Sequence, residues 1–114
     1  MAKIGIYLPK YFRLGDQKLL KAVDEAILRR ETLKLADKLT DLCGGCTQIE
    51  VTGYYKFPDG FFSEAPTIEM YCFCADDSAQ SVADELKPIL SDLRLRLRQN
   101  TIGLYVQDGK FIEC

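Results

Sequence analysis

The hydrophobic pattern of this chain changes at a short segment of two cysteines, two glycines and a threonine, residues 43–47. Residues 33–42 before it place leucines at helical spacing, whereas the residues after Thr47 alternate between polar and apolar. A helix commonly ends with a left-handed residue, a conformation that glycine adopts at little cost. We therefore expect Gly44 or Gly45 to end a helix and Thr47 to open a strand.

The hydrophobic residues of the remaining segments show the same two spacings, that of a helix or that of a strand. Alternation typical of strands occupies residues 3–8, 47–55, 67–74 and 102–106, and helical spacing occupies residues 16–42 and 76–98. The order strand, helix, strand, strand, helix, strand predicts a single α+β domain over residues 1–114. The expected fold is ferredoxin-like, βαββαβ, with an antiparallel sheet and two helices on one face. A turn signal at Asp108-Gly109 adds a short extra C-terminal edge strand.

The sequence alone leaves several helix boundaries undecided. Residues 16–42, which begin at a potential Asp16 cap, fit one long helix or two helices separated near Thr32. Residues 93–98 alternate leucine with arginine, but their continuity with the helical spacing before them favours a helix. Pro88 within that helix predicts a kink or a late start.

Composition narrows the classes of function. The chain has 114 residues, a net charge of −2 and no histidine. The lack of histidine removes the commonest general base and metal ligand, which excludes a Ser–His hydrolase. The slightly acidic charge argues against nucleic acid as a partner. No stretch is apolar enough for a membrane span, and the first residues already alternate as in a strand, so we expect a cytoplasmic protein without membrane contact.

Aromatic and acidic residues gather on the open face of the predicted sheet if the aliphatic residues of the strands face the helices. The predicted set is Tyr7, Tyr54, Tyr71, Phe73, Tyr105, Glu50 and Glu69. So many aromatic residues favour a contact surface for a second copy of the chain or for a small molecule. The two glutamates disfavour base stacking, because they repel phosphate. We rank self-association first, coverage by the chain's own hairpin second and a ligand pocket third.

The cysteines allow a metal site. Cys43, Cys46, Cys72 and Cys74 are candidate zinc ligands, because strand pairing brings Cys46 near Cys72. Their apolar neighbours favour buried thiols instead, and the first pair follows a helix C-terminus, whose dipole disfavours thiolate. We therefore expect no metal and no cofactor. The arginines at residues 29–30 and 94–98 are interpreted as solvated helix faces.

Four short motifs lie in the middle of the chain. They are the helix–strand junction Leu42-Cys43-Gly44-Gly45-Cys46-Thr47, the Gly53-Tyr54-Tyr55 segment, the Asp59-Gly60 turn and Glu64. This pattern resembles a family of small, uncharacterised ferredoxin-like proteins of bacteria and mobile genetic elements, which share a Gly-Gly-x-Thr junction. The resemblance implies a ferredoxin-like fold and an accessory role in a mobile element, and it supplies no activity.

These patterns predict a non-enzymatic, self-associating binding or interaction module, most simply a homodimer that contacts through its sheet face or edge. The alternative is a small cofactor-free enzyme, similar to the ferredoxin-like dimeric monooxygenases and isomerases. The two differ in whether a carboxylate or a tyrosine lies at the bottom of an enclosed cavity. The sequence identifies no catalytic residue.

Overall fold

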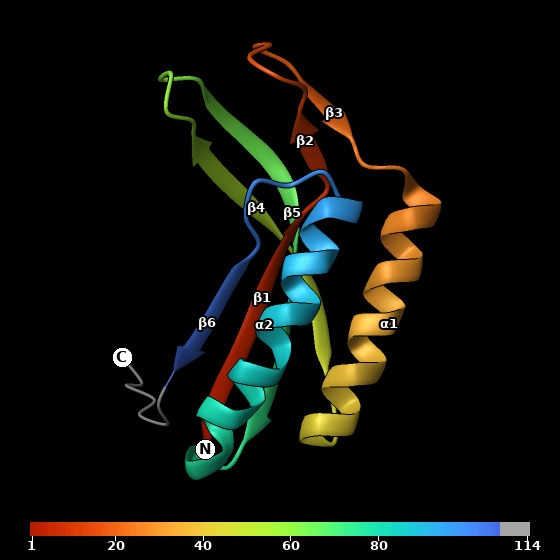
Figure 1. Ribbon diagram of the computed structural model, residues 1–114, viewed down its shortest axis with the longest axis vertical. Coiled ribbons are helices and arrows are strands. Elements are labelled where there is room, and N and C mark those ends of the chain that lie inside the picture. Colours follow the sequence, from red (N-terminus) through yellow and green to blue (C-terminus); the bar gives the residue numbers. More distant parts are fainter. Residues whose placement is uncertain (108–114) are drawn as a thin grey trace.

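A computed structural model of the chain describes residues 1–107 (Figure 1). Its elements, in chain order, are β1 (Ala2–Pro9), β2 (Tyr11–Arg13), β3 (Leu20–Ala22), α1 (Glu25–Cys43), β4 (Thr47–Lys56), β5 (Phe62–Cys74), the 3₁₀ turn η1 (Asp76–Ser78), α2 (Ala79–Arg96) and β6 (Gly103–Gln107). The predicted Asp108-Gly109 turn and the C-terminal edge strand lie outside the described residues.

Four strands form one antiparallel sheet in the order β4-β5-β1-β6. β1 pairs with β5 on one side and with β6 on the other, so the first strand and the strand before α2 occupy the centre. With α1 and α2, this order is that of the ferredoxin-like split βαβ fold. The predicted fold class is confirmed.

Both helices lie on one face of the sheet (Figure 1). The core beneath them contains alternate residues of the central strands and the inner residues of the helices, among them Ile4, Ile6, Leu8, Ile68, Met70, Cys72, Leu35, Leu39, Leu86 and Leu93. Because strand side chains point alternately to either side, the odd-numbered residues of β1 and β5 belong to the opposite, open face. Within residues 1–107, no helix is long and apolar enough to cross a membrane.

Residues 11–22 form a β-hairpin, which corrects the prediction of a helix from Asp16. β2 and β3 pair as a separate two-stranded sheet. Gly15 takes a left-handed φ of 60° in the turn, and Leu19, one of the leucines within the predicted helix of residues 16–42, is 73% exposed. The helical spacing of the leucines here was therefore no sign of a buried helix face.

The single helix α1 begins immediately after this hairpin. The side chain of Asp24 accepts a hydrogen bond from the backbone N–H of Ile27 at 3.1 Å, which satisfies a free donor of the first turn. The helix continues through Thr32 without a break, and within it the Thr32 hydroxyl donates to the carbonyl of Arg29 at 3.0 Å. The open question of one helix or two is thus answered as one, over a shorter range.

The second helix, α2, starts at Ala79 and includes Pro88, so the late start is not observed. Its last turns contain the leucine–arginine alternation, which is helical as expected. Arg96 Nε lies 3.0 Å from Oε1 of Glu31, an α1 side chain that is 2% exposed. Arg30 Nη2 lies 3.3 Å from the same oxygen, so two arginines of the predicted solvated faces neutralise a buried carboxylate, and Arg96 joins the two helices.

Candidate functional site

The open face of the sheet brings tyrosines from β1, β5 and β6 around one glutamate. Strand register places Tyr7 beside Glu69, and Gly5 between Tyr71 and Tyr105. A β-carbon at Gly5 would lie 2.0 Å from the ring Cζ of Tyr105. The absent side chain of Gly5 therefore lets the Tyr105 ring reach across β1 toward β5.

Glu69 is the buried acidic residue of this face, with 8% of its surface exposed. Its Oε2 accepts a hydrogen bond from the Tyr105 hydroxyl at 2.5 Å and lies 3.7 Å from Nζ of Lys3. The same Nζ stands 4.3 Å from the centre of the Tyr71 ring. A buried carboxyl group is tolerated where hydrogen bonds and opposite charge compensate its lost hydration. We refer to Lys3, Tyr7, Glu69, Tyr71 and Tyr105 as the Glu69 cluster.

Two phenols of this cluster, those of Tyr7 and Tyr105, have raised pKa values. Burial, the hydrogen bond to Glu69 and the nearby charge raise the pKa of Tyr105 well above its ordinary value of 10.0. Burial and, to a smaller extent, Glu69 also raise the pKa of Tyr7. At neutral pH both hydroxyls therefore act as hydrogen-bond donors and not as general bases.

Part of the aromatic surface remains accessible. The Tyr7 and Tyr105 rings lie 5.4 Å apart between centroids, and the Tyr71 and Phe73 rings meet edge to face at 5.9 Å. Tyr7 is 39% exposed, and Ile49, which β4 places on the other side of Glu69, is 41% exposed. Aromatic pairs with this accessibility are suited to contact with a partner or a ligand.

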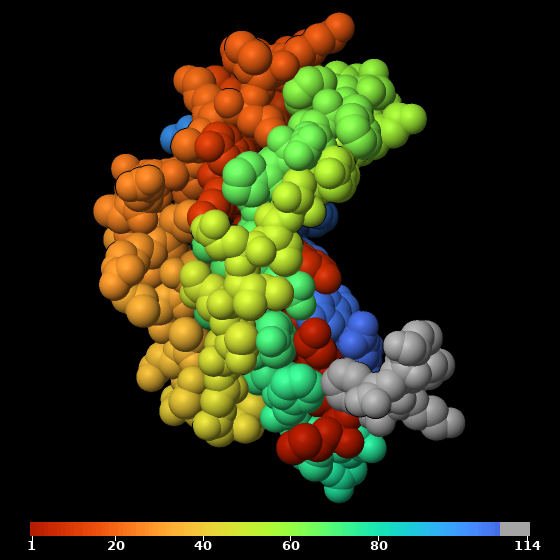
Figure 2. Space-filling model, turned by 180° about the vertical axis from the view of Figure 1, so that it is seen from behind, coloured from red at the N-terminus to blue at the C-terminus, as the bar shows by residue number. Residues whose placement is uncertain are grey.

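A concavity of about 480 Å³ lies along this face, lined among others by Tyr7, Tyr55, Thr67 and Glu69. Figure 2 shows the molecule from this side, hollowed between the β4–β5 hairpin and β6. The concavity is open to solvent, and the Tyr55 hydroxyl lies 2.9 Å from Oγ1 of Thr67 at its border. The carboxyl group of Glu69 thus lies in a surface hollow and not in an enclosed cavity.

The structure places Glu50 on the opposite side of the sheet from Glu69, contrary to the prediction. Glu50 pairs in register with Ile68, a core residue, and its carboxylate forms an ion pair with Lys10. The prediction assumed that the aliphatic residues of every strand face the helices. Because β4 lies at the sheet edge, Glu50 can face the helix side and still pair with a lysine there, which leaves Ile49 on the open face.

Tyr54 also lies on the helix side of β4, so its assignment to the open face is corrected. It is opposite Glu64 in register, is 63% exposed, and stacks on Phe62 with ring centroids 6.2 Å apart. Its neighbour Tyr55 takes the open-face position instead. The remaining predicted members, Tyr7, Tyr71, Phe73, Tyr105 and Glu69, share the open face.

Gly44 is the left-handed residue of the helix–strand junction, with a φ of 86°. Its N–H donates to the carbonyl of Thr40 at 2.8 Å, which satisfies one of the last carbonyls of α1. Gly45 has no positive φ. Thr47 then opens β4 directly opposite Tyr71, so the junction sets the register of β4 beside the Glu69 cluster.

The four candidate zinc ligands lie near one another as free thiols. Sγ of Cys72 is 2.8 Å from Sγ of Cys43, and Cys72 and Cys74 are buried. Burial and, after it, Cys43 raise the pKa of Cys46, Cys72 and Cys74. Such thiols resist the ionisation that metal binding needs.

Among residues 1–107, no group of three or more His, Cys, Asp or Glu side chains is arranged to hold a metal ion. The absence of zinc stays a prediction for elemental analysis.

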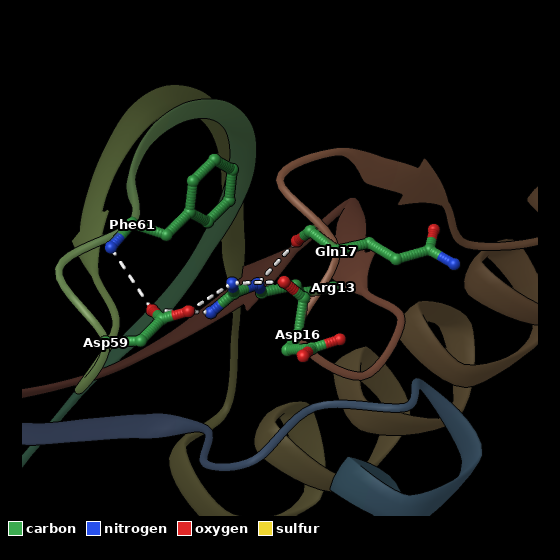
Figure 3. Close-up of polar contacts among 5 residues, drawn as sticks. All are labelled: Arg13, Asp16, Gln17, Asp59 and Phe61. Carbon is green, nitrogen blue, oxygen red and sulfur yellow. Dashed lines mark hydrogen bonds and ion pairs between the residues drawn. The ribbon is translucent and has the colours of Figure 1, made fainter.

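A second polar cluster, absent from the sequence prediction, connects the two hairpins (Figure 3). Arg13 on β2 donates two hydrogen bonds to the carboxylate of Asp59 in the β4–β5 turn, at 2.9 and 2.6 Å. The side chain of Arg13 is 6% exposed. Its guanidinium carbon also lies 4.7 Å from the centre of the Phe57 ring and 4.6 Å from that of Phe61. We call the Arg13–Asp59 pair the hairpin clasp.

The clasp lowers the pKa of the Asp59 carboxyl group. The hydrogen bonds from Arg13, followed by the one from the Phe61 N–H, lower the pKa of Asp59 from 3.8 to about 2. Arg13 also donates to the carbonyls of Asp16 and Gln17 at 2.9 and 2.6 Å, so it organises the β2–β3 turn as well. The donors of Arg13 are used within the fold, which makes the clasp a structural connection.

Comparison with known proteins identifies the fold and no closer relationship. No protein-family model matches the chain, and no curated protein matches it. CutA from Pyrococcus horikoshii is 13% identical over 99% of this chain and 88% of that one, with a TM-score of 0.59. The periplasmic divalent cation tolerance protein CutA from Archaeoglobus fulgidus is 13% identical over 99% and 89%, with a TM-score of 0.54. A phage SAM lyase in complex with S-methyl-5′-thioadenosine is 11% identical over 94% and 80%, with a TM-score of 0.60.

Proposed function

We propose that this chain is a non-enzymatic binding module that self-associates through the open face of its sheet. The observation that carries the proposal is the accessible apolar surface on both sides of Glu69, where Tyr7 is 39% and Ile49 is 41% exposed. Removing such side chains from water on association is favourable. A second copy of the chain offers the same surface, as a two-fold symmetric dimer requires.

The charges of the open face are compatible with burial in a dimer. Glu69 already accepts a hydrogen bond from Tyr105 and lies near Lys3, so covering the face leaves its carboxyl group with partners. The long edge strand β4 (Thr47–Lys56) supports a second mode of contact, because its outer edge pairs with no other described strand. The proposal includes a homodimer formed through the face, the edge or both.

Location and biological setting belong to the same proposal. It includes a cytoplasmic location and, from the resemblance carried by the junction motif at residues 42–47, an accessory role in a mobile genetic element. Neither enters the argument for self-association. The oligomeric state can therefore be tested independently of both.

A charge placed on the open face tests the proposal. We expect the native chain to dimerise in analytical ultracentrifugation and Ile49→Glu to be monomeric at the same concentration with an unchanged circular dichroism spectrum. The matched control is Leu33→Glu, which places the same charge on α1 at a leucine that is 57% exposed. A native chain that stays monomeric at high concentration, or equal dissociation by both variants, would contradict the proposal.

A cofactor-free enzyme is the second candidate, favoured by the buried position of Glu69. A carboxyl group between Tyr105 and Lys3, on the wall of a concavity of about 480 Å³, has the surroundings of a group that accepts a hydrogen bond from a bound small molecule. The phage SAM lyase supports this candidate, because a protein with a similar fold was solved with a bound nucleoside. The open form of the concavity favours the first proposal over this one.

S-methyl-5′-thioadenosine is a suitable probe for the second candidate. Calorimetric binding to the native chain that is lost in Glu69→Gln, with the oligomeric state retained, would support a small-molecule site at the Glu69 cluster. No heat of binding at millimolar probe, or equal binding by the variant, would remove this candidate.

A further inference from the structure

A second pocket lies between the two hairpins and adjoins the concavity beside Glu69, with which it shares Tyr55 and Thr101. It has a volume of about 460 Å³ and is bordered by β2, β3, the β4–β5 hairpin and residues 98–101 after α2. None of the five residues of the Glu69 cluster lines it. Sites for small organic ligands commonly have volumes of roughly 300–1,000 Å³, so the size suits a single small molecule. We call it the interhairpin pocket.

The lining of the interhairpin pocket is aromatic and positively charged. The aromatic residues are Tyr11, Phe12, Tyr54, Tyr55 and Phe57, and no aspartate or glutamate among residues 1–107 lines it. Arg13 contributes to the lining, but Asp59 neutralises its charge. Lys56 and Arg98 also line the pocket, and neither forms an ion pair with a carboxylate in the described part of the chain. Two uncompensated cations beside aromatic rings favour a ligand that is both aromatic and anionic.

Ser63 adds an unsatisfied polar atom to the same pocket. This residue lines the pocket, is 7% exposed, and its Oγ has no hydrogen-bond partner in the described structure. Buried hydroxyl groups nearly always find a partner, so an exception calls for an explanation. A ligand with a hydrogen-bonding group at this position would supply the missing partner.

Arg98 adopts a backbone conformation that an arginine rarely takes. It lies just after α2 with a φ of 55°. Its N–H donates to the carbonyl of Leu95 at 3.2 Å, and the N–H of Gln99 donates to that of Arg94 at 2.8 Å. These two bonds form a Schellman motif, whose left-handed position strongly favours glycine. The Arg98 guanidinium carbon lies 5.2 Å from the centre of the Phe12 ring, so the disfavoured conformation places a cation at the pocket wall.

We propose that the interhairpin pocket binds a small aromatic ligand bearing an anionic group such as a phosphate. The aromatic part packs among the tyrosine and phenylalanine rings of β2 and the β4–β5 hairpin. The anionic group pairs with Arg98 and Lys56, and a polar atom of the ligand hydrogen-bonds to Ser63. The inference does not depend on self-association, because neither Ile49 nor any residue of the Glu69 cluster lines the pocket, although Tyr55 borders both hollows.

The probe for this site is 1-naphthyl phosphate, and 1-naphthol is its neutral counterpart. We expect the phosphate to bind the full chain in a calorimetric titration and 1-naphthol to bind at least about tenfold more weakly, since a charge-assisted hydrogen bond discriminates by roughly that factor. Inorganic phosphate alone serves to measure the part of the affinity that needs no ring. Equal affinity for 1-naphthyl phosphate and 1-naphthol would overturn the proposal.

Two variants separate ligand binding from folding. Arg98→Gly supplies the residue that the left-handed position favours, so its melting temperature should not fall, while its affinity for 1-naphthyl phosphate should fall about tenfold. Ser63→Ala removes an unpartnered buried hydroxyl, so it should also retain stability and lose affinity. Arg94→Gln, in the last turn of α2 and outside the pocket lining, is the matched control with native affinity. Native affinity in both pocket variants, or no binding by the native chain at millimolar probe, would refute the site.

Discussion

The Glu69 side chain lies on the open face of the sheet, opposite the hydrophobic core. Alternation along β5 directs it away from the helices, β6 supplies a hydroxyl at 2.5 Å across β1, and β1 supplies an ammonium at 3.7 Å. Because the carboxyl group is largely desolvated, these two contacts decide whether it is tolerated there. The Tyr105 hydroxyl makes the shorter of the two and is therefore the atom to remove.

Tyr105→Phe should destabilise the fold. The change leaves Glu69 without its hydroxyl donor, and a hydrogen bond to a charged group contributes about 1.5–3 kcal/mol. Urea unfolding at pH 7 measures the loss. Tyr54→Phe is the matched control, because Tyr54 is 63% exposed and lies outside the cluster. Equal stability of the two variants would contradict the importance of the Tyr105–Glu69 bond.

The pH dependence provides a second measurement on the same variant. The pKa of Tyr105 in the folded chain is raised above 10.0. The unfolded chain therefore loses this proton first, so native stability declines as pH rises above about 10. In Tyr105→Phe this contribution to the alkaline decline should be missing. A decline of equal steepness in the variant would show that Tyr105 does not cause it.

Sequence alternation placed five of the seven predicted face residues on one side of the sheet, because a strand has a fixed period. It could not assign Glu50 and Tyr54 correctly, since the orientation of an edge strand depends on partners such as Lys10 that are distant in sequence. The bond between Glu69 and Tyr105 joins residues 36 positions apart, and no local pattern identifies it.

Among the elements, α1 ends where the sequence indicated, because its C-cap depends on local hydrogen bonds. The left-handed φ of 86° belongs to Gly44, while Gly45 has no positive φ. A β-carbon at either glycine would meet no heavy atom within 4 Å. The two neighbours therefore differ in backbone conformation and not in available space.

This difference gives a paired prediction for the junction. Gly44→Ala should destabilise the fold by about 1 kcal/mol, because alanine takes the left-handed conformation at a cost, and Gly45→Ala should be close to neutral. Thermal unfolding of the two variants side by side checks it. Equal melting temperatures for both variants and the native chain would show that the cap conformation contributes nothing to stability.

The β2–β3 hairpin was missed for a physical reason. Its strands have three residues each, too short for a clear alternation, while leucines 19 and 20 and Val23 fall at helical spacing by chance. The hairpin is fixed in place by Arg13, whose carboxylate partner lies 46 residues away in another turn. Local propensity carries no information about such a contact.

For the molecule as a whole, the clasp joins two hairpins that extend past the ends of the helices (Figure 1). These hairpins also border the interhairpin pocket, so the clasp holds the two walls of that pocket together. The helices do not cover this region in the ribbon view, which leaves the relative position of the hairpins dependent on Arg13 and its neighbours.

As the pH falls, the Arg13–Asp59 pair should break before the hydrophobic core is affected. The pKa of Asp59 is about 2 in the folded chain, lowered from 3.8. A carboxylate with a lowered pKa contributes its stabilisation fully above the unfolded value of 3.8 and loses it as pH falls toward 2. We expect Asp59→Asn to be less stable than the native chain at pH 6, and the difference to vanish near pH 2. Urea unfolding across this range measures it.

Asp16→Asn is the control for the clasp, because the Asp16 side chain accepts no hydrogen bond from Arg13 and contributes only the smallest of the charge interactions on it. The free energy of unfolding of Asp16→Asn should match that of the native chain throughout the pH range. Hydrogen exchange at pH 6 adds the spatial readout: in Asp59→Asn, the amides of β2 and β3 should exchange faster while those of β1 and β5 keep their protection, since the hairpin can open without the central sheet. A stability difference that is independent of pH, or equal acceleration in the central strands, would show that Asp59 does not act through the clasp.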